Sequence, residues 1–127
     1  MKIVFDPGHG GSDPGAVGKI YKEKDLTLEV CNKVKTKLDV ILARSKDVYV
    51  PLTNRGLMAK NGDLFISVHF NAFNSTASGS EVFYSVDLPN DKVYAAKISS
   101  DLSKALGIPD RGAKTREFRE CNEISIL

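Results

Sequence analysis

The stretch IVFDPGHGG, residues 3–11, runs from three apolar residues directly into a glycine-rich loop. A short β-branched and aromatic run that breaks at Pro and Gly is typical of a buried strand ending in a tight loop. His9 is therefore predicted at the carboxyl end of a strand, the edge where open α/β sheets bind ligands. The glycines around His9 would let a substrate or metal ion approach the backbone. The irregular continuation to Gly18 indicates either a functional or a disordered loop.

Length, composition and charge limit the class of protein. With 127 residues, 42% of them hydrophobic, the chain can form one domain, residues 1–127, with a substantial core. Its 18 basic and 16 acidic residues are mixed along the sequence. Nucleic-acid-binding proteins concentrate their basic residues, so nucleic acid is not an expected partner. The chain enters its first strand directly after Lys2, so we expect cytoplasmic synthesis without a signal peptide and no membrane contact.

Three segments have helical patterns. Residues 24–39 have amphipathic spacing, with Asp25 as the predicted N-cap. The apolar face of this helix is expected to contain Leu26, Val30, Val34 and Leu38, with Cys31 beside them. A short helix is predicted to begin at its cap Thr53 and to end before Gly62. Residues 91–106 form the third predicted helix, with inward positions that include Val93, Ile98, Leu102 and Ala105.

The other patterned segments are strand-like. The clearest is 64–70, which is largely apolar on both faces, as expected for a central parallel strand covered by helices. Shorter strands are predicted at 40–43, at 80–86 and from residue 124 onward, whereas the charged segment 111–120 is predicted to be turn-like. This order predicts a single α/β domain with a mostly parallel or mixed central sheet flanked by helices.

The chain contains two histidines, His9 and His69, and both are predicted to follow strands. A shared sheet edge would bring them together, although a lone histidine more commonly lies in a core or a surface loop. Glu23 would point to the same edge, although the dipole of the following helix also favours an acid there. Two histidines and one carboxylate are the ligands of a catalytic Zn²⁺ site whose fourth position is open to water. Hydrolysis of an amide or ester is the natural reaction of such a site.

Other catalytic arrangements match the sequence less well. Cys31 lies in an apolar helical context, where a buried thiol is favoured over a bridge to the distant Cys121. No serine occupies a GxSxG turn, which argues against an α/β-hydrolase nucleophile. The glycine-rich loop lacks both the GxxxxGK[ST] and the GxGxxG spacing of phosphate-binding loops.

Five segments, taken in order, carry a family resemblance: DPGHGGSDPGAVG at 6–18, EKDLTLEV at 23–30, ILARSKD at 41–47, LTNR at 52–55 and SVHFNA at 67–72. With them the sequence resembles the zinc-dependent N-acetylmuramoyl-L-alanine amidases of the amidase-3 type, cell-wall hydrolases of bacterial lytic enzymes and phage endolysins. The resemblance implies that His9, Glu23 and His69 hold Zn²⁺ in an α/β fold. It implies peptidoglycan as the substrate, cut at the amide between the lactyl group of N-acetylmuramic acid and L-alanine.

The resemblance also implies a feature that this sequence does not reach. In the family, a strand near the C-terminus leads into a glutamate that serves as general base, whereas this sequence ends at Leu127; Glu117, Glu120 and Glu123 precede that position. We therefore expect a C-terminally incomplete catalytic domain that lacks the last strand and helix and has impaired activity. Exposed apolar sheet surface would then favour self-association. The alternative is a non-catalytic, zinc-containing fragment that binds peptidoglycan.

Further residues have candidate supporting roles. Arg44 and Arg55 match family positions, but a polar strand exit and a first helical turn explain them nearly as well. Arg55 and Asn71 are candidates for contact with the substrate, and Asn71 is also compatible with an ordinary loop hydrogen bond. Asp6 and Ser67 are candidates for hydrogen bonds to the two histidines, because the ligands of zinc sites generally need such support.

Overall fold

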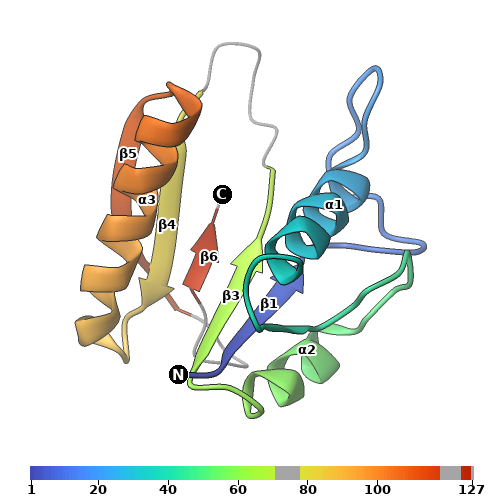
Figure 1. Ribbon diagram of the computed structural model, residues 1–127, viewed down its shortest axis with the longest axis horizontal. Coiled ribbons are helices and arrows are strands. Elements are labelled where there is room, and N and C mark those ends of the chain that lie inside the picture. Colours follow the sequence, from blue (N-terminus) through green and yellow to red (C-terminus); the bar gives the residue numbers. More distant parts are fainter. Residues whose placement is uncertain (71–77, 118–123, 127) are drawn as a thin grey trace.

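The computed structural model describes residues 1–70, 78–117 and the backbone of 124–126 (Figure 1). Within these ranges the strands are β1 (Ile3–Pro7), β2 (Ile41–Leu42), β3 (Leu64–Val68), β4 (Ser80–Ser85), β5 (Asp110–Arg116) and β6 (Ile124–Ile126). The helices are α1 (Glu23–Lys35), α2 (Leu52–Ala59), the short 3₁₀ turn η1 (Pro89–Asp91) and α3 (Lys92–Leu106).

One mixed sheet contains all of these strands, in the order β2-β1-β3-β6-β4-β5. β1 lies parallel to β2 and β3, and β3 lies parallel to β6. β4 is antiparallel to β6 and parallel to β5. The predicted central parallel strand is confirmed as β3. Because β1 and β3 are parallel neighbours, their carboxyl ends, and the loops that follow them, meet at one edge of the sheet.

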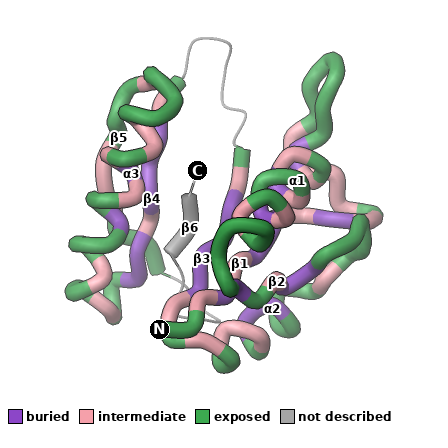
Figure 2. The backbone as a smooth tube through the Cα atoms, viewed as in Figure 1, coloured by how far each residue is buried: buried purple, intermediate pink, exposed green. Residues whose placement is uncertain are grey.

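Helices cover both faces of the sheet. Phe5 and Ile66 are paired in register, and the core cluster on their face includes Cys31 of α1 and Ile98 of α3. Side chains alternate along a strand, so the next register pair, Asp6 with Ser67, points to the opposite face, where Asp6 meets Arg55 of α2. Figure 2 shows buried residues along β1, β3 and β4.

Helix α1 is confirmed, but its cap and its inward face differ from the prediction. Asp25 makes no capping hydrogen bond; the carbonyls of Ala16 and Pro14 accept from the first free N–H groups of the helix instead. The fully inward positions are Glu23, Thr27 and Cys31. Val30, predicted on the apolar face, is exposed because the helix is rotated so that Glu23 and Thr27 face the loop after β1. Leu38 is exposed because α1 ends at Lys35, before the predicted end of the helix. Leu26 and Val34 are half-buried.

The details of α2 and α3 also differ. Thr53 lies inside α2, whose N-cap is Pro51, so the predicted cap is wrong. In α3 the inward positions are Ala95 and Ser99, while Val93 and Ala105 are exposed and Ile98 and Leu102 are half-buried. Small side chains are selected there because α3 lies close to β4: Ser99 Oγ donates to Ser80 O at 3.1 Å, and Ser80 Oγ donates to Ser99 O at 2.8 Å.

The segment predicted as a charged turn begins with strand β5, so the prediction is wrong for 111–116. β5 lies at the outer edge of the sheet, which explains its basic side chains. Arg111 and Lys114 pair there with Glu81 of β4. Charged side chains on an edge strand oppose pairing with a second sheet. The self-association expected from exposed sheet surface therefore has no support at this edge.

Cys31 is a fully buried thiol, as predicted. Burial, followed by the nearby charge of Asp6, raises the pKa of this thiol to about 12, so it is a poor nucleophile. Cys121 lies outside the described residues. In the part of the chain that the structure describes, none of the helices has the length and apolar character needed to cross a bilayer.

Candidate metal centre

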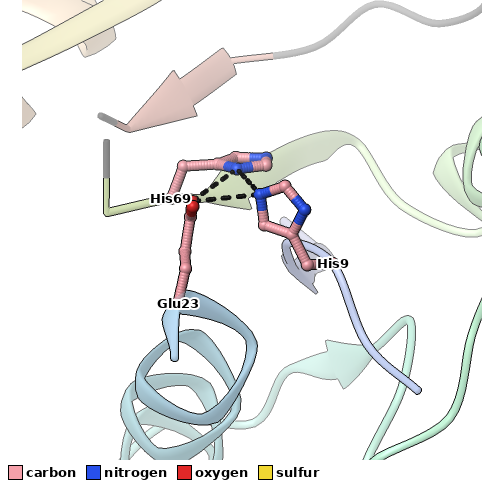
Figure 3. A group of neighbouring side chains, drawn as sticks. All are labelled: His9, Glu23 and His69. Carbon is pink, nitrogen blue, oxygen red and sulfur yellow. Dashed lines mark hydrogen bonds and ion pairs between the residues drawn. The ribbon is translucent and has the colours of Figure 1, made fainter. Parts of the chain in front are cut away.

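Three side chains from distant parts of the sequence converge beyond the ends of β1 and β3 (Figure 3). His9 follows β1, Glu23 is the first residue of α1, and His69 follows β3. His9 Nε2 lies 3.1 Å from Glu23 Oε1 and 3.2 Å from His69 Nδ1. Glu23 Oε1 lies 3.1 Å from His69 Nδ1. The structure thus brings together the three residues that were predicted as metal ligands.

The size and chemistry of this donor triangle fit a small divalent cation. Three atoms bound to one tetrahedral Zn²⁺ at roughly 2.0–2.1 Å lie about 3.3–3.4 Å apart. The three separations in the structure, 3.1, 3.1 and 3.2 Å, are slightly shorter and nearly equal. Two imidazole nitrogens and one carboxylate oxygen are also a donor set that Zn²⁺ commonly takes. The residues present therefore fit the metal that the sequence predicted.

Asp13 orients the ring of His9. Asp13 Oδ2 lies 2.9 Å from His9 Nδ1, and Asp13 Oδ1 accepts a 3.0 Å hydrogen bond from the N–H of Gly15. Burial opposes the ionisation of Asp13, but the hydrogen bonds with His9 and Gly15 outweigh it and hold its pKa below the usual value. An ionised carboxylate only accepts, so this contact favours a proton on His9 Nδ1 and leaves Nε2 as the nitrogen that faces the donor triangle.

The contact between Asp13 and His9 was not predicted from the sequence. A spacing of four residues implies contact in a helix but not in a loop. The contact depends on the backbone of His9, which has a φ of 62°, a left-handed conformation that is uncommon for residues other than glycine. Such a conformation costs free energy and persists only where the surrounding structure holds it.

Backbone N–H groups hold the carboxylate of Glu23. Its Oε2 accepts a 2.8 Å hydrogen bond from the N–H of Ala16, and its Oε1 accepts a 2.9 Å hydrogen bond from the N–H of Phe70. Burial would raise the pKa of Glu23, but hydrogen bonds with His69 and with these two N–H groups lower it to about 2. At neutral pH, Oε1 therefore presents negative charge to both histidines.

The glycines of the loop make room for protein groups. A Cβ atom on Gly8 would lie 2.5 Å from Cε1 of His69, and a Cβ atom on Gly10 would clash with the carbonyl oxygen of Val48. The expectation that these two glycines admit a ligand to the backbone is therefore wrong, because the protein itself fills the space. Gly8 matters to the site because it lets the ring of His69 pack against the backbone directly after β1.

Comparison with known proteins decides the family. A family model described as N-acetylmuramoyl-L-alanine amidase matches residues 3–127. The chain belongs to this family. It is 38% identical over 135 residues to the sporulation-specific N-acetylmuramoyl-L-alanine amidase of Bacillus subtilis, an alignment that covers 99% of this chain and 52% of that protein. It is 39% identical over 126 residues to the amidase LytC of the same organism, with 91% of this chain and 25% of LytC covered.

Solved structures of amidases have the same fold. The amidase from Clostridium difficile 630 superposes with a TM-score of 0.89 at 32% identity, covering 98% of this chain and 77% of that one. The catalytic domain of CwlV from Bacillus (Paenibacillus) polymyxa superposes with a TM-score of 0.87 at 32% identity, covering 99% and 79%. The predicted α/β class and the family resemblance are confirmed. The chain spans about half the length of the first curated relative and a quarter of the second.

In this amidase-family chain, Asp6 and Ser67 do not support the histidine rings as predicted. Asp6 Oδ1 accepts a 2.5 Å hydrogen bond from Arg55 Nη1, and Asp6 Oδ2 accepts a 3.0 Å hydrogen bond from Ser67 Oγ. The reason is their register, which directs both side chains to the face covered by α2, whereas the rings lie beyond the strand ends.

The two predicted substrate contacts have different outcomes. Arg55 is 6% exposed, and its guanidinium donates to Asp6 and to the carbonyls of Pro7 and His9. These contacts favour support of the loop, and contact of Arg55 with substrate stays a prediction. Asn71 lies outside the described residues.

A cavity of about 370 Å³ opens beside Glu23, one of the three converging donors. Its lining is mostly apolar and consists of Ala16, Gly18, Lys19, Ile20, Tyr21, Glu23, Leu26 and Phe70. Glu23 belongs both to the donor triangle and to the cavity wall, so a molecule in the cavity would lie against the metal centre. Ile20 and Tyr21, in the loop before α1, are 83% and 61% exposed, so two of the apolar side chains that line the cavity are open to solvent.

Proposed function

We propose that this chain is the zinc-dependent part of an enzyme that hydrolyses the amide between N-acetylmuramic acid and L-alanine in peptidoglycan. The observation that carries the proposal is the convergence of His9, Glu23 and His69 into a triangle of metal size, in a chain of the amidase family. Its relatives are named for this activity. The bacterial cell wall would then be the site of action, in a bacterial lytic enzyme or a phage endolysin.

The residues of the chain prepare the site for this reaction. Zn²⁺ held by His9 Nε2, Glu23 Oε1 and His69 Nδ1 would lower the pKa of a bound water molecule and polarise the substrate carbonyl. Asp13 keeps the lone pair of His9 Nε2 available. The N–H groups of Ala16 and Phe70 keep Glu23 ionised and aligned.

The apolar cavity beside Glu23 suits the groups that flank the scissile amide. The lactyl group and L-alanine each carry a methyl group, and burying a methyl against apolar walls is worth about 0.8 kcal/mol. We propose that Ile20, Tyr21 and Phe70 contact this part of the substrate. Lys19 adds a positive charge at the cavity wall, which favours an anionic peptide stem.

The family resemblance implies a general-base glutamate beyond Leu127. We propose no residue of this chain for that role. Because a general base typically contributes a factor of about 10² to 10⁴, we propose that a polypeptide of residues 1–127 cleaves slowly while it still binds Zn²⁺. The alternative function is that of a non-catalytic, zinc-containing module that binds peptidoglycan.

The test uses purified cell walls. Residues 1–127 are incubated with the walls in the presence of Zn²⁺, in the presence of a chelator, and as the His69→Ala variant. We expect slow release of peptides that begin with L-alanine, with the sugar chain intact, in the Zn²⁺ sample alone. If the chain sediments with the walls but releases no peptide over long incubation, the binding module is the correct function. If sugar fragments appear instead, the substrate bond is wrong.

A further inference from the structure

Two buried arginines lie next to the candidate metal centre. They donate hydrogen bonds to backbone carbonyls at and beside the residues that carry its donor atoms. Arg44 and Arg55 are 3% and 6% exposed. Burying a guanidinium is costly unless its N–H groups are bonded, so an arginine in this position is expected to have a specific structural purpose.

Arg44 connects the residues adjacent to His9 and Glu23. Its Nε donates to Pro7 O at 2.9 Å, and its Nη2 donates to Gly8 O at 2.9 Å and to Lys24 O at 2.8 Å. Gly8 immediately precedes His9, and Lys24 immediately follows Glu23. One rigid, planar group therefore sets the separation between the loop that carries His9 and the first turn of α1. Thr27 Oγ1, which donates to Gly8 O at 2.8 Å, strengthens the same connection.

Arg55 connects the segments that carry the two histidines. Its Nη2 donates to His9 O at 2.7 Å, and its Nη1 donates to Asp6 Oδ1 at 2.5 Å. The other carboxylate oxygen of Asp6 accepts from Ser67, which lies two residues before His69. The hydrogen bond to His9 O also holds the left-handed backbone of His9 in place.

We propose that Arg44 and Arg55 are positioning residues of the metal centre. Arg44 sets the edge of the donor triangle between His9 and Glu23, and Arg55 sets the edge between His9 and His69. This proposal rests on the proposed function, because it requires a metal ion at these donors. It differs from the predicted role of Arg55, since neither arginine needs to touch the substrate.

The shape of the guanidinium explains why arginine is required at both places. In the described residues, the hydrogen bonds of Arg44 go to carbonyl and hydroxyl oxygens on three segments: the end of β1, the first turns of α1, and its own loop through Lys46 O. A lysine keeps the charge but has a single nitrogen, so it cannot reach acceptors on three segments together. A lysine variant therefore separates geometry from charge.

The experiment compares the parent chain with Arg44→Lys, Arg55→Lys and the control Arg111→Lys, which alters an exposed arginine on β5 at the far edge of the sheet. Zn²⁺ affinity is measured by competition with a chromophoric chelator, and thermal unfolding is measured without metal. The visible spectrum of bound Co²⁺ reports the ligand geometry. We expect Arg44→Lys and Arg55→Lys to lose about 10- to 100-fold in Zn²⁺ affinity, as is typical when support of a metal ligand is removed. Both should change the Co²⁺ spectrum, and the control should match the parent.

The outcomes separate this proposal from the function on which it rests. If the parent binds no Zn²⁺, both the metal centre and the roles of the arginines are wrong. If the parent and the folded lysine variants bind Zn²⁺ with equal affinity and spectrum, only the positioning roles are wrong. Should Arg44→Lys fail to fold, Thr27→Val removes one hydroxyl from the same connection while both arginines stay. Equal Zn²⁺ affinity in folded Thr27→Val would then overturn the role of Arg44, and a loss of about threefold or more would support it.

Discussion

Asp13 Oδ2 lies 2.9 Å from His9 Nδ1, on the side of the ring away from the donor triangle. This contact selects which nitrogen of His9 carries the proton, and so which nitrogen can bind a metal ion. The candidate metal centre therefore depends on a residue that is not one of its three donors.

Asp13→Asn is expected to weaken Zn²⁺ binding about 10- to 100-fold while the chain stays folded. The amide of asparagine can donate to Nδ1 as well as accept from it, so the proton is no longer held on Nδ1. Competition with a chromophoric chelator measures the affinity. Asp101→Asn is the matched control, because the ion pair that Asp101 makes within the described part of the chain is with the exposed Lys97 on α3. Equal affinity of Asp13→Asn and parent would contradict the tautomer argument.

The metal-free chain should lose stability in acid through Glu23. The pKa of Glu23 is lowered to about 2 in the folded chain, below its ordinary value of 4.5, so the folded state holds the ionised form more tightly than the unfolded state does. The resulting stabilisation is fully present above pH 4.5 and disappears as the pH falls toward 2. It amounts to about 3 kcal/mol.

Urea unfolding of metal-free protein from pH 6 to pH 2.5 measures this loss. Glu23→Gln is expected to be less stable near neutral pH and to have a flatter dependence on pH over this range, because its amide does not titrate. Parallel pH profiles for the parent and Glu23→Gln would show that other acids cause the loss.

Gly8→Ala should abolish tight Zn²⁺ binding, because the new Cβ atom would lie 2.5 Å from the ring of His69 and must displace it. Gly107→Ala is the control. Gly107 ends α3 with a φ of 65° and has open space around it, so its replacement costs about 1 kcal/mol of backbone strain and leaves the site intact. Unfolding curves and Zn²⁺ affinities of the two variants test this distinction. Tight metal binding by folded Gly8→Ala would disprove the packing argument.

Tyr21→Ala should lower kcat/KM on cell-wall substrate about 2- to 10-fold without changing Zn²⁺ affinity. The expected loss corresponds to one aromatic contact with the substrate, about 0.5–1.5 kcal/mol. Tyr94→Ala, which removes an exposed tyrosine from α3, is the control. If both variants keep the parental kcat/KM, Tyr21 does not contact the substrate.

Local patterns predicted the elements well where a hydrophobic segment was long. The apolar run at 64–70 predicted β3, and the break at Gly107 predicted the end of α3, which has its C-cap there. The predictions failed where a distant segment overrides the local pattern. The N–H groups at the start of α1 bond to the carbonyls of Pro14 and Ala16, so Asp25 is not needed as a cap. Strand β5 is charged because it is an edge strand, which a single segment does not reveal.

The sequence by itself determined the fold class and the family, and it predicted the three residues that converge at the candidate metal centre, because these follow from residue types and from patterns that span a few positions. Only the tertiary structure decided how the donors are held. His69 is 60 positions from His9 and 46 from Glu23, so their separations depend on the register of β1 with β3 and on how α1 packs against the sheet. The supporting roles of Asp13, Arg44 and Arg55 arise from hydrogen-bond geometry, which depends on atomic positions that no local pattern encodes.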